Sequence, residues 1–193
     1  MKLEIKKKLL NRSERVKSVE LHSSLPWVLI GLYSGTVAIF DYNTQSCVKQ
    51  FEISKEPVRC ARFILRKEWI VAGTDDNNML VYNYTTSERV KTINAHSDYI
   101  RSVIVHPQLP YVISCSDDLT IKIWDWEKNW EEVNTYQDHE HFVMQIVFNP
   151  KNHNQFASAS LDKTIKIWTV STTTKTANYS LLGHQAGVNV VDF

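Results

Sequence analysis

Cations that recur at a fixed spacing are the side chains best placed to do chemistry in this sequence. Lys17, Arg59 and Arg101 lie 42 residues apart, and Arg15 stands two residues before the first of them. If the fold brings equivalent positions together, three neighbouring cations repel one another. An anion is therefore their natural partner. Met144 and Asn189 occupy the same repeat position later in the chain, where the positive charge stops.

Acidic and aromatic side chains accompany these cations at constant offsets. Asp98 precedes Arg101 by three residues and Asp117 follows it by 16, while Tyr33 occupies the second offset in the first repeat. Such a surface suits a ligand that carries both a carboxylate and an ammonium, because each charge then meets its opposite. Taken singly, each acidic residue is more simply explained as part of a solvated loop with an internal ion pair.

The elements that must position these side chains follow from an internal repeat. The similar segments AIFD, LVYN, IKIWD and IKIWT occur once in each successive unit, and their aromatic residues are spaced by 42, 42 and 44 residues. Within each unit, short runs of alternating or β-branched residues between polar turns indicate four strands. An unrelated β-sandwich would show neither this regular spacing nor a recurrent His, Asp and Trp.

The third and fourth units carry a longer signature, in SDDLTIKIWD and SLDKTIKIW. It resembles that of WD repeats, whose fold is a β-propeller with one four-stranded sheet, or blade, per repeat. Two sets of residues are complete and are expected to form buried hydrogen-bonded chains. They are His96, Ser114, Asp118 and Trp124, and His139, Ser158, Asp162 and Trp168. The first two units lack the full set and are expected to rely on apolar packing.

The repeat predicts an all-β, incomplete WD-repeat propeller, with about four and a half blades of an expected seven. The blades span roughly 12–53, 54–95, 96–138 and 139–183, and a fifth begins at 184–193, with VNVVDF as its inner strand. Residues 1–193 are then the N-terminal part of a propeller. Its open ends would expose apolar faces and strand edges, so we expect poor solubility or association.

Composition excludes several classes of protein. The 22 Lys and Arg nearly balance the 21 Asp and Glu, and a net charge of +1 argues against a general nucleic-acid binder. Three widely spaced cysteines predict no disulfide framework, and no stretch is apolar enough to cross a membrane. Because phosphate-binding and hydrolase motifs are missing, we expect no enzyme and no cofactor.

Two features keep alternatives open. His139, Glu140 and His141 stand together in a predicted loop, but the repeat already uses the first of them, so a metal site is the weaker interpretation. The N-terminal basic residues could contact RNA or anionic lipid, although a solvated strand end explains them more simply. These residues are Lys6, Lys7, Lys8 and Arg12.

Longer stretches extend the resemblance beyond the repeat. The coatomer β′ subunit family, part of the COPI vesicle coat, has an amino-terminal propeller very similar to MKLEIKKKLLNRSERVKSVELH, PWVLIGLYSGTVAIFDY and HSDYIRSVIVHPQLPYVISCSDDLTIKIWDWEKNW. EKNW and the stretch around LYSG make the likeness specific, because the repeat does not demand them. The resemblance implies a propeller that captures the cytosolic C-terminal dilysine tails of membrane cargo for Golgi-to-ER and intra-Golgi transport.

The resemblance also implies site residues and partners. Arg15, Lys17 and Arg59 match the positions that hold the tail's carboxylate, with Arg101 in support, and Tyr33, Asp98 and Asp117 match those that receive a signal lysine. Implied partners are α-COP and other coatomer subunits, through regions outside this chain, and an Arf-family GTPase. The implied location is the cytoplasm, peripheral on Golgi membranes and COPI vesicles. A generic WD-repeat scaffold, indifferent to a free carboxylate, is the alternative.

Overall fold

The computed structural model describes residues 4, 5, 8 and 15–193 and consists of four antiparallel four-stranded sheets, here called blades 1 to 4. Blade 1 contains β1 (Val16–Leu21), β2 (Trp27–Leu32), β3 (Thr36–Asp41) and β4 (Ser46–Glu52). Blade 2 contains β5 (Val58–Ile64), the 3₁₀ helix η1 (Leu65–Lys67), β6 (Trp69–Thr74), β7 (Asn78–Asn83) and β8 (Arg89–Asn94). Blade 3 contains β9 (Ile100–Val105), β10 (Tyr111–Ser116), β11 (Ile121–Asp125) and β12 (Glu131–Tyr136). Blade 4 contains β13 (Val143–Asn149), β14 (Asn152–Ser160), β15 (Ile165–Thr169) and β16 (Tyr179–Leu181).

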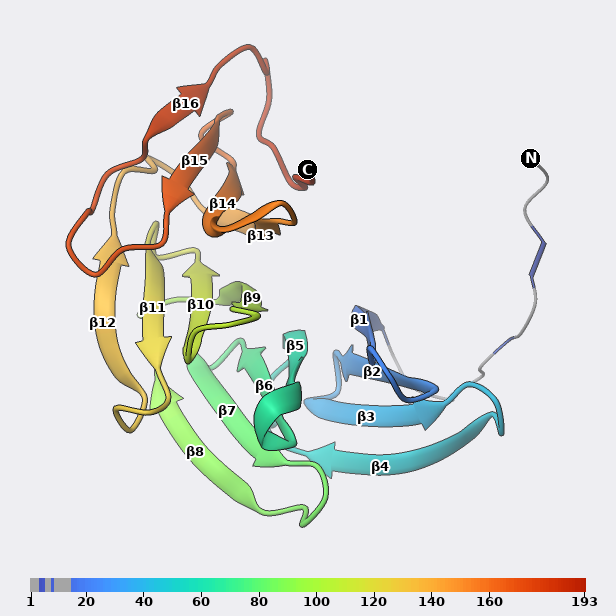
Figure 1. Cartoon of the computed structure of the whole chain (residues 1–193). Helices are drawn as coiled ribbons and strands as arrows, with labels where there is room; N and C mark the ends of the chain where they lie inside the picture. The colour runs from blue at the N-terminus through green and yellow to red at the C-terminus, as the bar shows by residue number, and fades with distance from the viewer. Residues whose placement is uncertain (1–3, 6–7, 9–14) are drawn as a thin grey trace.

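The blades form an arc around an open centre (Figure 1). The first strand of each blade lies on the inner side, where β1 contacts β5, β5 contacts β9 and β9 contacts β13. The fourth strands lie on the outside of the arc. This arrangement confirms the predicted all-β fold and partial propeller. No helix within the described residues is long and apolar enough to cross a membrane.

One predicted element does not form. The segment VNVVDF, residues 188–193, is not a strand, and residues 184–193 begin no fifth sheet. Instead, the Val188 N–H donates to the Ser160 carbonyl at 2.9 Å and the Val191 N–H donates to Gln145 Oε1 at 2.8 Å. A strand needs a partner to complete its ladder of hydrogen bonds, and no further strand is available beside this segment among the described residues.

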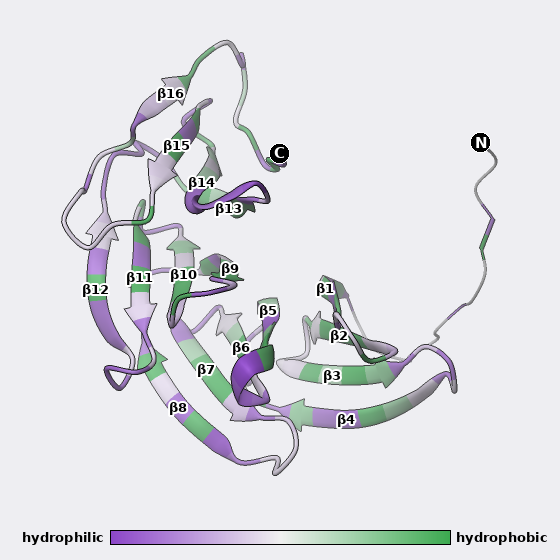
Figure 2. Ribbon diagram, viewed as in Figure 1, coloured by the Kyte–Doolittle hydropathy of each residue, from purple (hydrophilic) through white to green (hydrophobic). Residues whose placement is uncertain are grey.

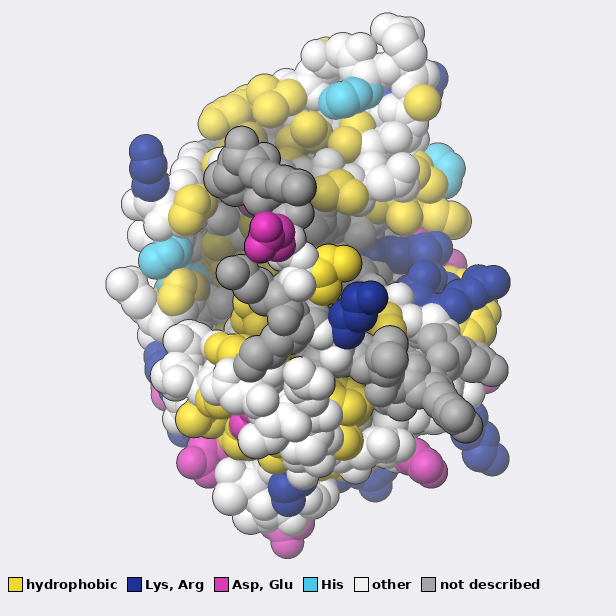
Figure 3. All heavy atoms as spheres, turned by 90° about the vertical axis from the view of Figure 1, so that its right-hand side faces the viewer, with side chains coloured by type: hydrophobic (Ala, Val, Ile, Leu, Met, Phe, Trp, Pro, Cys, Tyr) yellow, Lys and Arg dark blue, Asp and Glu magenta, His cyan; other side chains and the backbone are white. Residues whose placement is uncertain are grey.

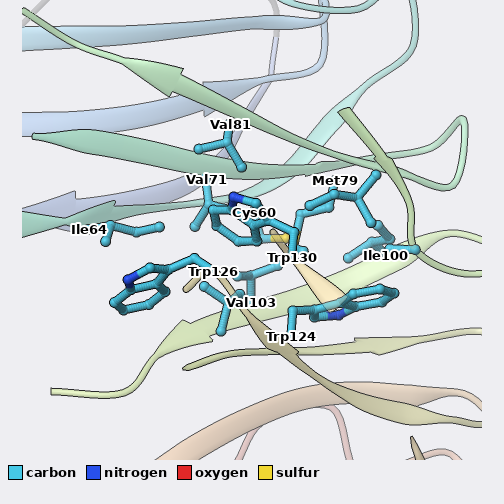
Figure 4. Close-up of a cluster of buried hydrophobic side chains, with 13 residues drawn as sticks. Cys60, Ile64, Val71, Met79, Val81, Ile100, Val103, Trp124, Trp126 and Trp130 are labelled. Atoms are coloured by element: carbon cyan, nitrogen blue, oxygen red, sulfur yellow. The ribbon is translucent and has the colours of Figure 1, made fainter. Parts of the chain in front are cut away.

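Apolar side chains fill the space between neighbouring blades. Val71 and Met79 of blade 2 pack in one cluster with Ile100, Val103 and Trp124 of blade 3 (Figure 4). Fully burying a side chain of this kind contributes about 1.5–3 kcal/mol, so these layers hold the arc together. The outermost strands carry more hydrophilic stretches, as Figure 2 shows for β8 and β12.

Apolar side chains are also exposed at both ends of the arc. Among the described residues, blade 1 and blade 4 each have a neighbouring blade on one side only. Val19 and Leu21 of β1 are exposed, as are Tyr179 and Leu181 of β16. Figure 3 shows hydrophobic side chains on the side where the arc is open. The exposure agrees with the expectation for blades that lack a neighbour.

A residue in the left-handed conformation turns the chain between the second and third strands of every blade. The four equivalent residues are Gly35, Asn77, Leu119 and Lys163, with φ of 80°, 67°, 72° and 73°. Gly35 is required, because a Cβ there would lie 2.0 Å from the Ser54 carbonyl oxygen. Where the residue is not glycine, a preceding aspartate supports the turn, as Asp118 Oδ1 does by accepting the Thr120 N–H at 3.0 Å.

Blades 3 and 4 contain the predicted buried hydrogen-bonded chains. In blade 4, His139 Nδ1 lies 2.6 Å from Asp162 Oδ2, and His139 Nε2 lies 2.6 Å from Ser158 Oγ. Trp168 Nε1 donates to the same Oγ at 2.8 Å. The corresponding distances in blade 3 are 2.8, 2.7 and 2.9 Å, among His96, Asp118, Ser114 and Trp124. Each chain therefore pairs its buried polar groups completely.

These chains shift the pKa values of their titratable members. Burial alone would raise the pKa of Asp162, but hydrogen bonds from Thr164 and His139 outweigh it and hold this pKa at about 2, below the ordinary 3.8. The pKa of Asp118 is lowered in the same way. Burial lowers the pKa of His139, which favours the neutral ring.

Blade 2 contains a reduced chain that the sequence analysis did not predict. Ser54 Oγ donates to Asp76 Oδ2 at 3.1 Å, and Thr74 Oγ1 donates to Asp76 Oδ1. The expectation that blade 2 relies on apolar packing alone is therefore wrong: a serine replaces the histidine and still reaches the aspartate. In the described part of blade 1, Ser34 Oγ donates only to Thr36 Oγ1, at 3.2 Å, so the network seen there is smaller still.

The three cysteines are free and differ in exposure. Cys60 and Cys115 are buried, and burial raises the pKa of Cys60 to about 11 and that of Cys115 well above its ordinary value. Cys47, on the outer strand β4, is exposed.

Candidate functional site

An open hollow of about 230 Å³ lies where the inner strands begin. Its lining includes the predicted repeat position of every blade and of the final segment. These residues are Lys17, Arg59, Arg101, Met144 and Asn189, here called the rim residues. The structure thus brings the three regularly spaced cations to one place. Lys and Arg side chains also gather at one edge of the open side in Figure 3.

One backbone hydrogen bond per blade sets a second side chain beside each rim residue. In each blade, the residue 16 or 17 positions after the rim residue donates its backbone N–H. The acceptor is the carbonyl of the residue two positions before the rim residue. The four bonds are Tyr33 to Arg15 at 2.8 Å, Asp75 to Pro57 at 3.0 Å, Asp117 to Tyr99 at 3.1 Å and Leu161 to Phe142 at 3.0 Å. Tyr33, Asp75, Asp117 and Leu161 are here called the pair residues.

Blades 2 and 3 use this placement to close two arginine–aspartate pairs. Arg59 Nη2 donates to Asp75 Oδ2 at 2.8 Å, and its Nε donates to Oδ1. Arg101 Nε donates to Asp117 Oδ1 at 2.6 Å, and its Nη2 donates to Oδ2. The bond to Asp117, opposed by burial, raises the pKa of Arg101, and the charges of Asp117, Asp75 and Asp98 add to the effect. Each pair is bidentate, so each guanidinium has a fixed orientation.

Tyr99 contacts the arginines of both pairs. Its ring centroid is 5.1 Å from Arg59 Cζ and 5.9 Å from Arg101 Cζ. Both guanidinium groups are within the range of a cation–π interaction with this ring. Tyr99 remains 40% exposed, so it also forms part of the surface around the hollow.

Blade 1 departs from this pattern. Its rim residue is Lys17 and its pair residue is Tyr33, which is 39% exposed and has no charge. Arg15 Cζ lies 5.6 Å from the Tyr33 ring centroid. Neither Arg15 nor Lys17 has an ion pair with any other described residue, and both are exposed. The unbalanced positive charge of the rim therefore lies in blade 1.

The two predicted lysine-binding acids have different environments. The side chain of Asp117 is only 3% exposed and is occupied by Arg101. Asp98 is half-buried, and its Oδ1 accepts the N–H of Tyr99 at 2.7 Å. The carboxylate of Asp98 is therefore more accessible to a ligand than that of Asp117. Asp117 lies beside the rim residue Arg101, but its oxygens already accept hydrogen bonds from that arginine.

Sequence reasoning missed the roles of Asp75 and Tyr99. Asp75 was within reach of a spacing argument, because it stands 16 residues after Arg59, as Asp117 does after Arg101. The constant offset signalled an internal pair in each of two blades. Tyr99 had no such signal, because its contacts run from its own blade to the neighbouring one.

The other candidate sites gain no support from the described residues. His139 is held by Asp162 and Ser158, and no cluster of three metal-binding side chains occurs in the described part of the chain. Lys8 is exposed and belongs to no strand. Lys6, Lys7 and Arg12 lie outside the described residues, as does the predicted start of the first blade at residue 12.

Comparison with known proteins gives two findings. The WD40 family (WD domain, G-beta repeat) matches residues 87–125 and 130–169. Over 193 residues, the chain is 56% identical to coatomer subunit beta'-1 of Oryza sativa subsp. japonica, 56% identical to coatomer subunit beta'-2 of Arabidopsis thaliana and 51% identical to coatomer subunit beta' of Homo sapiens. Each match covers 100% of this chain and 21% of the relative, so the chain spans about a fifth of their length.

Proposed function

This chain is a WD40-repeat protein homologous along its whole length to coatomer beta' subunits, and from this premise we propose that it serves in a COPI coat by binding C-terminal dilysine tails of membrane cargo. The observation that carries the proposal is the convergence of Lys17, Arg59 and Arg101 on one hollow, with carboxylates beside the two arginines. A peptide terminus that ends in a carboxylate and carries lysines upstream has the complementary charges.

In this proposal, the terminal carboxylate of the tail binds Arg15, Lys17 and Arg59, and Arg101 supports it. Binding there relieves the repulsion between neighbouring cations, since the anion lies between them. Each exposed contact contributes about 1 kcal/mol or less, and a partly shielded charged hydrogen bond about 1.5–3 kcal/mol.

The signal lysine meets Asp98, Asp117 and Tyr33. Asp98 offers the more open carboxylate, whereas at Asp117 the ammonium competes with Arg101 for the same oxygens. Tyr33 offers an exposed ring to the lysine cation. The total for one tail is about 8 kcal/mol, a micromolar affinity, so selective transport relies on many coat subunits acting together.

The wider assignment follows the relatives. We propose association with other coatomer subunits, α-COP among them, through parts of the protein outside these 193 residues. Membrane attachment would be peripheral, through the coat and an Arf-family GTPase, on Golgi membranes and COPI vesicles facing the cytoplasm. The relatives carry the name of a coat subunit rather than of an enzyme.

Calorimetry with synthetic tails tests the proposal. A dilysine peptide with a free carboxylate should bind with micromolar affinity, and amidation of its terminus should abolish most of the binding. Arg59→Glu should abolish it too, because the new carboxylate would stand beside Asp75 and face the ligand's own. Equal binding of the acid and amide peptides would contradict the proposal and favour a generic scaffold.

The lysine subsite needs a different variant. Asp117→Lys would place a new cation beside Arg101 at a nearly closed position, so loss of binding could follow from misfolding. Asp98→Lys is the better test, because Asp98 is half-buried and loses only one local hydrogen bond. We expect it to reduce binding strongly with an unchanged circular dichroism spectrum. Undiminished binding would remove Asp98 from the site.

A further inference from the structure

The rim contains two kinds of cation. Arg59 and Arg101 are each neutralised by an aspartate of their own blade, whereas in blade 1, whose rim residue is Lys17, the uncharged Tyr33 occupies the position of the aspartate. The arginine–aspartate pairs of blades 2 and 3 have no net charge. The net positive charge of the rim and pair residues therefore comes from blade 1 alone. Two cations at equivalent repeat positions therefore cannot act on an anion in the same way.

Arg59 keeps one edge for a ligand. Its Nε and Nη2 donate to Asp75, while Nη1 has no hydrogen-bond partner among the described residues. The Tyr99 ring, with its centroid 5.1 Å from Cζ, supports one face of the guanidinium. A guanidinium held on one edge and one face points its remaining donor in a fixed direction, and less side-chain entropy is lost when it binds.

From these contacts we propose that Asp75 is a positioning residue: it orients Arg59 as a directed donor to the ligand's carboxylate, while Arg15 and Lys17 supply the net charge that attracts the ligand. This rests on the proposed function and assigns a role to a residue outside the predicted site. It also separates two properties of binding, the discrimination for a free carboxylate and the dependence on salt.

The pairing makes the loss of Arg59 unusually costly. The side chain of Asp75 is 7% exposed, so Arg59→Ala leaves a poorly solvated carboxylate beside the place where the ligand's carboxylate must bind. Truncating one member of such a pair loses more binding free energy than the pair itself contributes, because the other charge remains buried without a partner. Removing Asp75 as well should therefore restore part of the affinity.

The first experiment measures a dilysine peptide with a free carboxylate against the chain, Arg59→Ala and the Arg59→Ala, Asp75→Ala double variant. We expect the single variant to bind about 30-fold more weakly and the double variant to recover about tenfold, where tenfold corresponds to ~1.4 kcal/mol. If the double variant binds no better than the single one, the proposal is overturned. The matched control is the ion pair between Lys122 and Glu132, which are 2.9 Å apart and do not line the hollow. Lys122→Ala and the Lys122→Ala, Glu132→Ala double variant should both bind the peptide as the parent chain does.

The second experiment varies salt from about 0.05 to about 0.5 M. Lys17→Ala should flatten the dependence of affinity on salt, because a net charge has gone. The Arg59→Ala, Asp75→Ala variant should keep the slope and lose most of the preference for the acid over the amide peptide. A flattened slope in the double variant would contradict the division between the blades.

A third measurement needs no ligand and so separates this proposal from the proposed function. In a nitrogen-labelled chain, the Arg59 Nε–H should give a sharp NMR signal protected from exchange, which Asp75→Ala should abolish and Lys17→Ala should leave. Asp75→Asn, which keeps the shape, serves if the alanine variant fails to fold. A protected signal that survives in both Asp75 variants refutes the positioning role, whereas failure of the parent to bind any dilysine peptide refutes the proposed function alone.

Discussion

Blade 1 and blade 4 lie at opposite ends of the arc and have different side chains at the same repeat positions, both in the blade interior and at the rim. Blade 4 has the complete chain from Trp168 to Asp162 inside and apolar Met144 at its rim. Among the described residues, blade 1 has only the bond between Ser34 and Thr36 at the corresponding turn, and no acidic side chain forms an ion pair with Lys17 at its rim. The blade with the stronger interior has the neutral rim.

The difference teaches that the residues that stabilise a blade and those of the proposed binding site occupy separate positions of one repeat. The buried histidine, serine, aspartate and tryptophan join strands within a blade, and none of them lines the hollow. The rim residues of the four blades lie near the starts of the first strands, and the pair residues directly follow the ends of the second strands. A repeat of this kind can change its ligand without changing its fold.

The largest effect should come from breaking the interior of blade 4. Ser158→Ala leaves Trp168 Nε1 and His139 Nε2 buried without a partner, which should lower the free energy of unfolding by about 2–3 kcal/mol. The smaller network of blade 1 is tested by Ser34→Ala, which removes one partly buried bond from an exposed serine and should cost less than about 0.5 kcal/mol. Denaturant titration measures both, and equal losses would show that the two interiors do not differ.

Giving blade 1 the rim of blade 4 should affect binding instead. Lys17→Met removes the rim charge that no aspartate balances and should weaken the binding of a dilysine peptide about tenfold, ~1.4 kcal/mol. The melting temperature should stay the same, since Lys17 is exposed. A loss of stability with unchanged affinity would reverse the roles assigned to rim and interior.

Acid should act on blade 4 through its buried chain. The pKa of Asp162 is about 2 in the folded chain and 3.8 ordinarily, so its contribution to stability is complete above pH 3.8 and is lost as the pH falls through 2. Asp162→Asn should flatten the pH dependence of unfolding in that window. Tryptophan fluorescence against pH provides the readout, and an unchanged profile in the variant would exclude Asp162 as the titrating group.

The smallest effect should follow from giving blade 4 the pair of blade 2. Met144→Arg with Leu161→Asp would add a partly exposed ion pair of no net charge. Stability should change by less than about 0.5 kcal/mol and affinity for a dilysine peptide by less than about twofold. A large gain in affinity would mean that orientation alone, without net charge, suffices for binding.

The register of the repeat could be predicted because it depends on periodic side chains alone. The spacing of His139, Ser158, Asp162 and Trp168 reproduces that of His96 and its partners, and both chains form as predicted. The rim positions follow from the same register. Counting residues places them correctly because every blade has nearly the same length.

The pairing at the rim could not be predicted so directly. Whether Asp75 faces the solvent or Arg59 depends on the backbone bond from its N–H to Pro57, a contact that residue types do not announce. Tyr99 acts across two blades and is set by their packing. The segment VNVVDF has the residue pattern of a strand but forms none. A strand requires a neighbouring strand as its hydrogen-bonding partner, and a residue pattern does not show whether such a partner is present.

The uneven exposure of the three cysteines offers a practical handle. Cys47 has an accessible thiol, whereas Cys60 and Cys115 are enclosed and hard to ionise. A maleimide fluorophore should therefore attach at one place, on the outer edge of blade 1. Cys47 is not among the residues that line the hollow, so the label would report tail capture without any engineered residue and without blocking the surface it monitors.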